Sequence, residues 1–162
     1  MKKKGLIIAS LLILALSFVF LGCPPPEEEE ETFVPVSDAA MKDLKEKIGY
    51  TDSLFPSPKC DYSTYKYDVD AQGYESIAIA WKDGDADKFA AYKEAWGDKI
   101  KTNSVSVARA SYIEAAGGTL TLTDKDGKAF EKAFISLVGT AGDVNDNGLS
   151  VNAGDILFVI YK

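Results

Sequence analysis

A basic and then apolar segment at the start of the sequence limits which residues can contribute to a folded domain. Lysines occupy positions 2–4, and residues 5–22 carry no charge and only two serines as polar side chains. This order of charge and apolarity is typical of an export signal, which is removed from the mature protein. We therefore predict that residues 1–22 are a signal and that the folded part follows Cys23, outside the cytoplasm.

The end of the apolar run, Phe20-Leu21-Gly22-Cys23, resembles the lipobox of bacterial lipoproteins, in which a small residue precedes a cysteine. Phe20 stands where that motif usually has an aliphatic residue. The resemblance implies that Cys23 is diacylated, that the signal is cleaved before it, and that lipid anchors the chain to a membrane of the bacterial cell envelope. The alternative is a retained single-span anchor, because the run approaches the about 20 apolar residues that cross a bilayer.

A low-complexity segment follows the predicted lipid anchor. Three prolines at positions 24–26 precede five glutamates at positions 27–31. Prolines favour an extended backbone and like charges repel one another, so we predict that residues 23–35 are a tether between the membrane and the domain. Binding of a basic partner or of cations by the acidic run is the alternative interpretation.

The charge balance excludes nucleic acid as a partner. The chain has 18 Lys and Arg residues against 25 Asp and Glu residues, a net charge of −7 at pH 7, and Arg109 is its only arginine. Nucleic-acid backbones bind clustered basic side chains, whereas the lysines here are scattered. An acidic surface is also repelled by anionic headgroups, so we expect the acyl chains, rather than the protein surface, to contact the membrane.

The absence of histidine limits the chemistry available to the domain. It removes Ser-His-Asp and Cys-His catalysis and the common zinc hydrolase sites. We therefore predict a non-enzymatic envelope or surface protein that binds a protein or a glycan or has a structural role. The alternative is a small histidine-independent hydrolase that uses carboxylates or a metal, although no two carboxylates stand out by their spacing.

The two cysteines, Cys23 and Cys60, have different predicted roles. If Cys23 carries lipid, Cys60 has no partner within the chain, so we expect no intrachain disulfide. We interpret Cys60 as a half-buried small hydrophobic residue. An intermolecular bridge and a reactive thiol are the alternatives.

Two amphipathic segments predict helices. The first begins at Ser37 or Asp38, either of which can cap its N-terminus, and ends at Gly49. The second begins in the aspartate-rich residues 83–87 and ends at Gly97, and its aromatic side chains share one face. A glycine just after the last turn is typical of a helix end, so both boundaries are predicted with a physical reason.

Alternating apolar and polar residues predict strands in the rest of the domain. A hairpin is predicted over residues 65–81, with its turn at Gly73 and one face formed by its larger apolar side chains. Residues 128–138 fit either a helix or a strand, and we favour a strand. The strongly apolar residues 156–161 are predicted to form a central strand, because such a strand at a sheet edge would invite aggregation.

Two further strands are predicted over residues 105–113 and 119–123, joined by a turn at residues 115–118. Hairpins therefore dominate the sequence. We predict an α+β fold with a mostly antiparallel sheet or a β-sandwich, one N-terminal helix and one inserted helix. A single globular domain is expected to cover residues 36–162.

In the loop over residues 143–155, alternate oxygen-bearing side chains at Asp143, Asn145 and Asn147 precede Gly148. This part resembles the first half of the calcium loops of dockerins and EF-hand proteins, but Asp155 falls at position 13 rather than 12 and an apolar strand follows. The resemblance implies a Ca²⁺ site, which the few carboxylates of the loop would make weak, and an Asn/Gly-rich connection between strands is the alternative. The candidate ligands are Asp143, Asn145, Asn147, Leu149, Asn152 and Asp155.

Aromatic residues gather in and around the predicted hairpin, at Tyr62, Tyr65, Tyr67, Tyr74 and Trp81. Aromatic side chains on a sheet can form a platform for a sugar or a peptide, but they are also common as cross-strand pairs that pack a sheet. For the first interpretation, the candidate ligand-binding residues are Tyr65, Tyr67 and Trp81.

Overall fold

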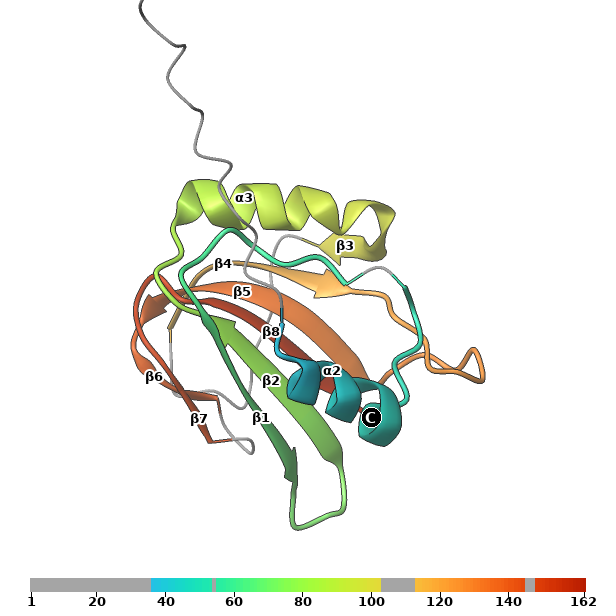
Figure 1. Ribbon diagram of the computed structural model, residues 1–162. Helices are drawn as coiled ribbons and strands as arrows, with labels where there is room; N and C mark the ends of the chain where they lie inside the picture. The colour runs from blue at the N-terminus through green and yellow to red at the C-terminus, as the bar shows by residue number, and fades with distance from the viewer. Residues whose placement is uncertain (1–35, 54, 103–112, 145–147) are drawn as a thin grey trace, which may run out of the picture. The chain divides into compact units, whose positions relative to one another are not determined.

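A six-stranded sheet in which all neighbouring strands are antiparallel forms the centre of the computed structural model (Figure 1). In their order across the sheet, the strands are β1 (Ser63–Val69), β2 (Glu75–Trp81), β8 (Ile156–Tyr161), β5 (Lys132–Thr140), β4 (Ile113–Leu120) and β3 (Ile100–Thr102). A separate hairpin pairs β6 (Gly142–Val144) with β7 (Leu149–Val151). The predicted α+β class with a mostly antiparallel sheet is confirmed.

The structure describes residues 36–53, 55–102, 113–144 and 148–162, all within the compact unit Thr32–Lys162. The predicted signal, Cys23 and the tether therefore lie outside the described residues. Most of the strand predicted over residues 105–113 also lies outside them. No helix of the described residues combines the length and the apolarity that a membrane span requires.

Both predicted helices are present, with the expected caps. In α2 (Asp38–Asp43), the Ser37 hydroxyl accepts a hydrogen bond of 3.2 Å from the main-chain N–H of Ala40. The helix continues as a turn of π-helix, η1 (Leu44–Ile48), and ends at Gly49, whose φ is 83°. Glycine has no Cβ to oppose this left-handed conformation, so the predicted end is confirmed.

The inserted helix is α3 (Ala86–Ala95). It is followed by a 3-10 turn, η2 (Gly97–Lys99). The Asp85 carboxylate accepts a hydrogen bond of 2.8 Å from the main-chain N–H of Lys88 and so caps the first turn. The aromatic residues Phe89, Tyr92 and Trp96 are buried on one face. The aspartates before this helix therefore start it, as the sequence indicated.

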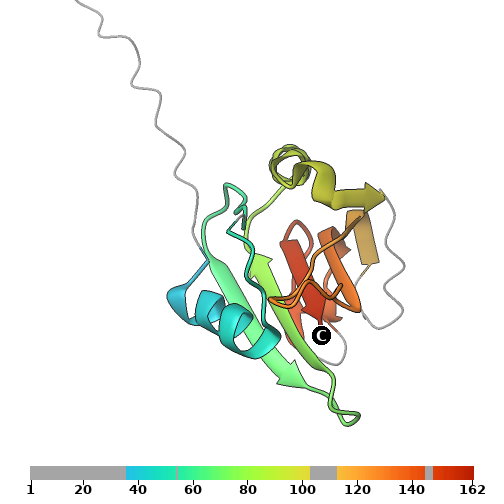
Figure 2. The ribbon, with the colours of Figure 1, turned by 90° about the vertical axis from the view of Figure 1, so that its right-hand side faces the viewer.

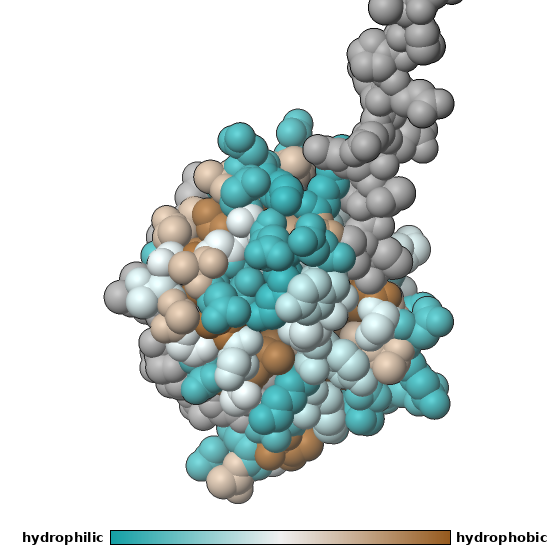
Figure 3. Space-filling model, turned by 60° about the vertical axis from the view of Figure 1, so that its left-hand side comes forward, coloured by the Kyte–Doolittle hydropathy of each residue, from teal (hydrophilic) through white to brown (hydrophobic). Residues whose placement is uncertain are grey.

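Buried side chains form one cluster on each face of the sheet, because alternate residues of a strand point to opposite sides. In β2, Ile77, Ile79 and Trp81 belong to the cluster that both helices cover, whereas Ala78 and Ala80 belong to the other. The second cluster also includes residues of β6 and β7, so this hairpin covers the face opposite the helices. In the view of Figure 3, hydrophobic surface is limited to small areas separated by hydrophilic side chains.

The apolar strand β8 lies inside the sheet, between β2 and β5 (Figure 2). The prediction of a central strand over residues 156–161 is confirmed, and β5 confirms that residues 128–138 contribute a strand rather than a helix. The hairpin prediction is also confirmed, because β1 and β2 pair directly and Gly73 has a φ of 86° in the turn.

The turn predicted at residues 115–118 is wrong, since β4 runs through them without reversing. The register of β4 against β5 shifts near Glu114, so a bulge accommodates the small residues. A Cβ atom at Gly117 would lie 2.4 Å from Oε1 of Glu114. This glycine therefore allows the Glu114 side chain to lie over the strand, where it accepts a 2.7 Å hydrogen bond from the Ser136 hydroxyl.

Candidate functional site

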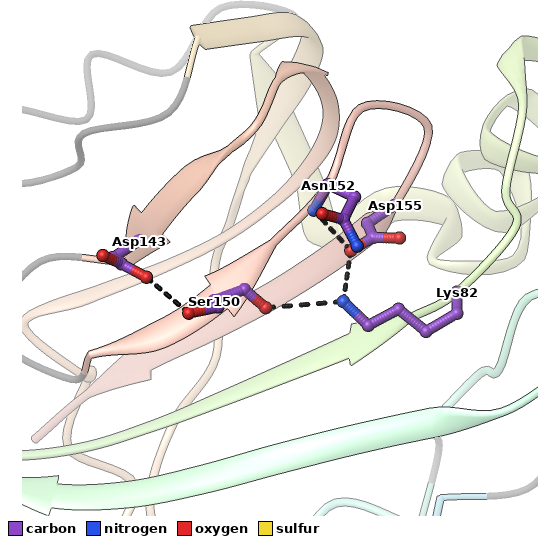
Figure 4. Close-up of polar contacts among 5 residues, drawn as sticks. All are labelled: Lys82, Asp143, Ser150, Asn152 and Asp155. Carbon is purple, nitrogen blue, oxygen red and sulfur yellow. Dashed lines mark hydrogen bonds and ion pairs between the residues drawn. The ribbon is translucent and has the colours of Figure 1, made fainter.

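An ion pair between Lys82 and Asp155 is the main polar feature of the face that the β6–β7 hairpin covers (Figure 4). Lys82 follows the last residue of β2, and Asp155 precedes the first residue of β8. Trp81 lies opposite Ile156 in the last paired position of β2 and β8. Lys82 and Asp155 therefore lie opposite each other one position beyond the end of this pairing. Their side chains are only 11% and 4% exposed.

The remaining contacts of the pair are made to β7 and to the turn that follows it. The main-chain N–H of Asn152 donates a 2.8 Å hydrogen bond to Oδ2 of Asp155, the oxygen that also contacts Lys82. The Lys82 ammonium group lies 3.4 Å from the main-chain carbonyl oxygen of Ser150. The ion pair thus holds the β6–β7 hairpin against the ends of β2 and β8, and each charge has an opposite charge beside it.

Two glycines permit the backbones to meet next to this pair. A Cβ atom at Gly84 would lie 2.6 Å from the main-chain oxygen of Gly154 and 2.7 Å from Cγ1 of Ile156. Gly154 itself has a φ of 89°, which a residue with a Cβ rarely adopts. The segments after β2 and before β8 therefore cross in direct contact.

The predicted calcium ligands are divided among different environments. Asp143 lies on β6 opposite Ser150, whose hydroxyl donates a 2.6 Å hydrogen bond to its carboxylate. Asp155 instead pairs with Lys82, and Figure 4 shows the two aspartates with separate partners. Leu149 begins β7 and Asn152 follows it. Asn145 and Asn147 lie outside the described residues, so calcium binding stays a prediction.

No group of three or more acidic or cysteine side chains gathers in a metal-binding arrangement within residues 36–53, 55–102, 113–144 and 148–162. The ends of the predicted loop form a β-hairpin, in which Val144 pairs with Leu149. This pairing agrees with the alternative interpretation, an Asn/Gly-rich connection between strands.

The predicted aromatic platform is corrected by the position of Trp81. Its side chain is 0% exposed and packs in the cluster beneath α3, so it cannot contact a ligand at the surface. Tyr65 and Tyr67 are partly buried on the same face, beneath α2 and η1. Their hydroxyls donate to Asp43 at 3.5 Å and to Glu75 at 2.9 Å. Both tyrosines therefore have structural contacts.

The exposed apolar side chains of this region are different ones. Tyr62 is 54% exposed, Val69 48% and Tyr74 45%. They lie just before β1, at its end, and in the turn before β2. Strand alternation alone does not identify these exposed residues. It predicts the face of the sheet on which a side chain lies, but not whether a helix or a loop packs over that face.

A chain of polar contacts fastens η1 to the strands. The Lys162 ammonium donates to Oε2 of Glu75 and to the main-chain oxygen of Lys47, at 2.7 Å each, and the Lys47 ammonium lies 4.1 Å from the ring centroid of Tyr67. The hydrogen bond from Lys162 holds the pKa of Glu75 below its usual value. Burial and the bond to Glu75 raise the pKa of Tyr67.

Of the two cysteines, Cys60 lies within the described residues. Its side chain is a free thiol, and the residue is buried, with 5% exposure. Burial raises the pKa of this thiol from 9.0 to about 11. A thiol reacts as its thiolate, so Cys60 is poorly reactive at neutral pH. The interpretation as a small hydrophobic residue is favoured over that of a reactive thiol.

Comparisons with known protein families, with curated proteins and with solved structures find no match to the chain.

Proposed function

We propose that the chain is a bacterial lipoprotein whose α+β domain is held at the cell envelope by lipid on Cys23 and acts there as a non-enzymatic binding or structural module. The observation that carries the proposal is the order of three lysines, an uncharged run and Gly22-Cys23. The acidic composition supports lipid over protein surface as the membrane contact, since anionic headgroups repel an acidic chain.

Mass spectrometry of the N-terminus tests the anchor. The full-length gene is expressed in a bacterium, and the membrane fraction is analysed after proteolysis. We expect a peptide that begins with a diacylglyceryl-modified Cys23, and we expect the Cys23→Ser variant to keep its leader and to lack the lipid. Recovery of an intact end at residue 1 or 2 from the wild-type chain would instead indicate a retained transmembrane anchor.

The contacts of the described polar side chains support a non-enzymatic role. Lys82 and Asp155 neutralise each other, and the Cys60 thiol is protonated at neutral pH. A screen of the purified chain against esters, glycosides and phosphates tests the alternative of a histidine-independent hydrolase. Turnover that disappears with one Asp or Glu substitution would overturn the non-enzymatic proposal.

Calcium binding by the loop over residues 143–155 is a second proposal, which would make the domain a calcium-stabilised module that binds a glycan or a protein. The exposed Asp143 in the middle of β6 supports it, because this carboxylate lies two positions before the asparagine-containing residues 145–147 in the sequence. The test compares melting temperatures with calcium and with a chelator. We expect calcium to raise the value in the wild type and in Asp126→Ala, but not in Asp143→Ala. Equal values with calcium and with chelator would end this proposal.

A further inference from the structure

Strand β1 is the outermost strand at one edge of the sheet, within the part of the chain that the structure describes. It has seven residues and pairs with β2 without a register shift. At the opposite edge, β3 has three residues and a shifted register. Proteins protect exposed edges by short strands, bulges or prolines, because unpaired backbone groups are a template for another strand. β3 has two of these devices. β1 has none of the three, and its protection is limited to the charged side chains of Lys66 and Asp68.

The hydrogen bonds at the ends of β1 identify which of its residues face outward. The main-chain N–H of Asp70 donates to the oxygen of Tyr74 at 3.0 Å, and that of Lys82 donates to the oxygen of Tyr62 at 2.9 Å. In an antiparallel pair the residues bonded to the neighbour alternate with residues that are not. Even-numbered residues of β1 therefore bond to β2. The residues that direct their N–H and C=O groups away from β2 are Ser63, Tyr65, Tyr67 and Val69.

We propose that two copies of this chain pair edge to edge through β1, antiparallel and centred on Tyr67, to form one continuous sheet. In this register Tyr67 lies opposite the partner's Tyr67, and Tyr65 opposite the partner's Val69. Outward-facing residues thus meet outward-facing residues, as antiparallel hydrogen bonding requires. A symmetric dimer follows from the two-fold relation, because the same strand is used by both copies.

Charge favours this register over the symmetric registers centred on Lys66 or Asp68. It places Lys66 opposite the partner's Asp68, and Asp68 opposite the partner's Lys66. Moving the centre to either of these residues would place two lysines or two aspartates directly opposite each other, which is unfavourable in a cross-strand pair. Lys66 also has an interaction within its own chain. The new ion pairs therefore add little to the strength of the dimer and mainly favour one register, while the backbone hydrogen bonds hold the two strands together.

The exposed apolar side chains around β1 agree with such an interface. Tyr62, Val69 and Tyr74 are the large hydrophobic residues that are most exposed in the described part of the chain, and all three lie in or beside β1 and its turn. The proposed register places Val69, which is 48% exposed, against the partner's Tyr65. Cross-strand pairs of aromatic and β-branched side chains stabilise sheets, so this pairing would cover part of the exposed Val69 side chain.

A charge-reversal cycle tests the register on the full chain in nonionic detergent, by sedimentation velocity over a range of protein concentrations. We expect the wild type to dimerise, and Lys66→Asp and Asp68→Lys each to weaken the dimer by about tenfold, because two like-charge pairs replace two opposite-charge pairs. The double variant restores opposite charges and should regain wild-type association. A monomer at every concentration, or a dimer that neither single reversal weakens, overturns the proposal.

Amide hydrogen exchange tests the edge itself, independently of the lipid anchor. We expect the amides of Tyr65, Tyr67 and Val69 to become protected as the protein concentration rises, while those of Lys66 and Asp68 stay equally protected by β2. Val69→Pro removes an outward N–H and should abolish the dimer, whereas Val69→Thr should keep it. Exchange at the outward amides that does not change with concentration overturns the proposal, even where the chain associates through its lipid.

Discussion

The Lys82 side chain lies against the Asp155 carboxylate one position beyond the last register pair of β2 and β8. The pair has little contact with solvent, and Asp155 also accepts a hydrogen bond from the N–H of Asn152. Removing two charges from water is costly and their attraction must offset that cost. The contact therefore makes the attachment of the β6–β7 hairpin depend on both residues at once.

Asp155→Ala is expected to lower the free energy of unfolding by about 3–5 kcal/mol, because it leaves the Lys82 ammonium group buried without a counter-charge. Urea denaturation followed by tryptophan fluorescence measures the change. Replacing both partners, in Lys82→Met with Asp155→Leu, should recover most of the loss, since no unpaired charge then remains.

The exposed ion pair between Lys125 and Asp126 provides the control for this prediction. Its side chains are 65% and 68% exposed and lie 2.5 Å apart. Asp126→Ala should change stability much less than Asp155→Ala does, because solvent screens an exposed pair. Equal effects of the Asp126 and Asp155 substitutions would show that burial does not govern the Lys82–Asp155 contact.

Gly84→Ala is expected to destabilise the domain by about 1–3 kcal/mol, the usual cost of adding a methyl group where there is no room for it. The new Cβ would meet the main-chain oxygen of Gly154 at 2.6 Å, and that atom cannot move as a side chain can. A thermal melt gives the measurement. Gly127→Ala is the matched control, because its Cβ would meet no atom within 4 Å and only its φ of 76° opposes the change. A smaller loss at residue 84 than at residue 127 would contradict the role of the crossing.

Much of the fold could be predicted from local signals. The Ser37 and Asp85 caps, the glycine after each helix and the turn at Gly73 depend on residues close in sequence, and the structure confirms them. The turn predicted at residues 115–118 failed because β4 runs through them and pairs with β5, whose residues are distant in the sequence. Gly117 leaves room for the Glu114 side chain, which accepts a hydrogen bond from Ser136 on β5, and the sequence carries no sign of that contact.

The candidate site could be predicted less well, because its contacts join distant parts of the chain. The sequence makes Asp155 a candidate calcium ligand because of its neighbours in the loop, whereas its ion-pair partner Lys82 is 73 residues away. The sequence makes Trp81 a candidate for a binding surface, because alternation places residues on one face without showing what covers that face. Both faces of this sheet are covered, one by helices and the other by the β6–β7 hairpin.

The acid stability of the domain is expected to depend in part on Glu75. The pKa of its carboxyl is lower in the folded chain than its ordinary value of 4.5, chiefly because Lys162 donates a hydrogen bond to it. A lowered pKa stabilises the fold at pH values above 4.5, and this contribution is lost as the pH falls through the folded value. Glu75→Gln should therefore lower stability at pH 7 by less than about 1 kcal/mol, as for a partly exposed pair.

Chemical denaturation between pH 7 and pH 3 measures this dependence. Stability should fall less steeply with acid in Glu75→Gln than in the wild type, and Lys162→Met should flatten the same part of the profile. Asp38→Asn is a control at an exposed carboxylate that contacts neither residue of the pair. Parallel profiles for Glu75→Gln and the wild type would exclude the Glu75–Lys162 bond as a source of the acid dependence.

The alkaline stability of the domain is expected to depend on Cys60. Burial raises the pKa of its thiol from 9.0 to about 11, so the folded chain keeps a proton that the unfolded chain releases. The unfolded state therefore binds fewer protons between these values, and stability falls as the pH rises from 9.0 to about 11. The buried hydroxyls of Tyr50 and Tyr92, whose pKa values burial also raises, add to the loss above pH 10.0, where tyrosines of the unfolded chain begin to release their protons.

Cys60→Ala separates the thiol from the tyrosines. It should lower stability at pH 7, because it removes a buried sulfur atom, but it should flatten the decline between pH 9 and pH 11 that the thiol causes. Unfolding by urea at closely spaced pH values gives both quantities from one set of curves. A decline as steep in Cys60→Ala as in the wild type would mean that the thiol is not the group that titrates, and would assign the alkaline dependence to the tyrosines alone.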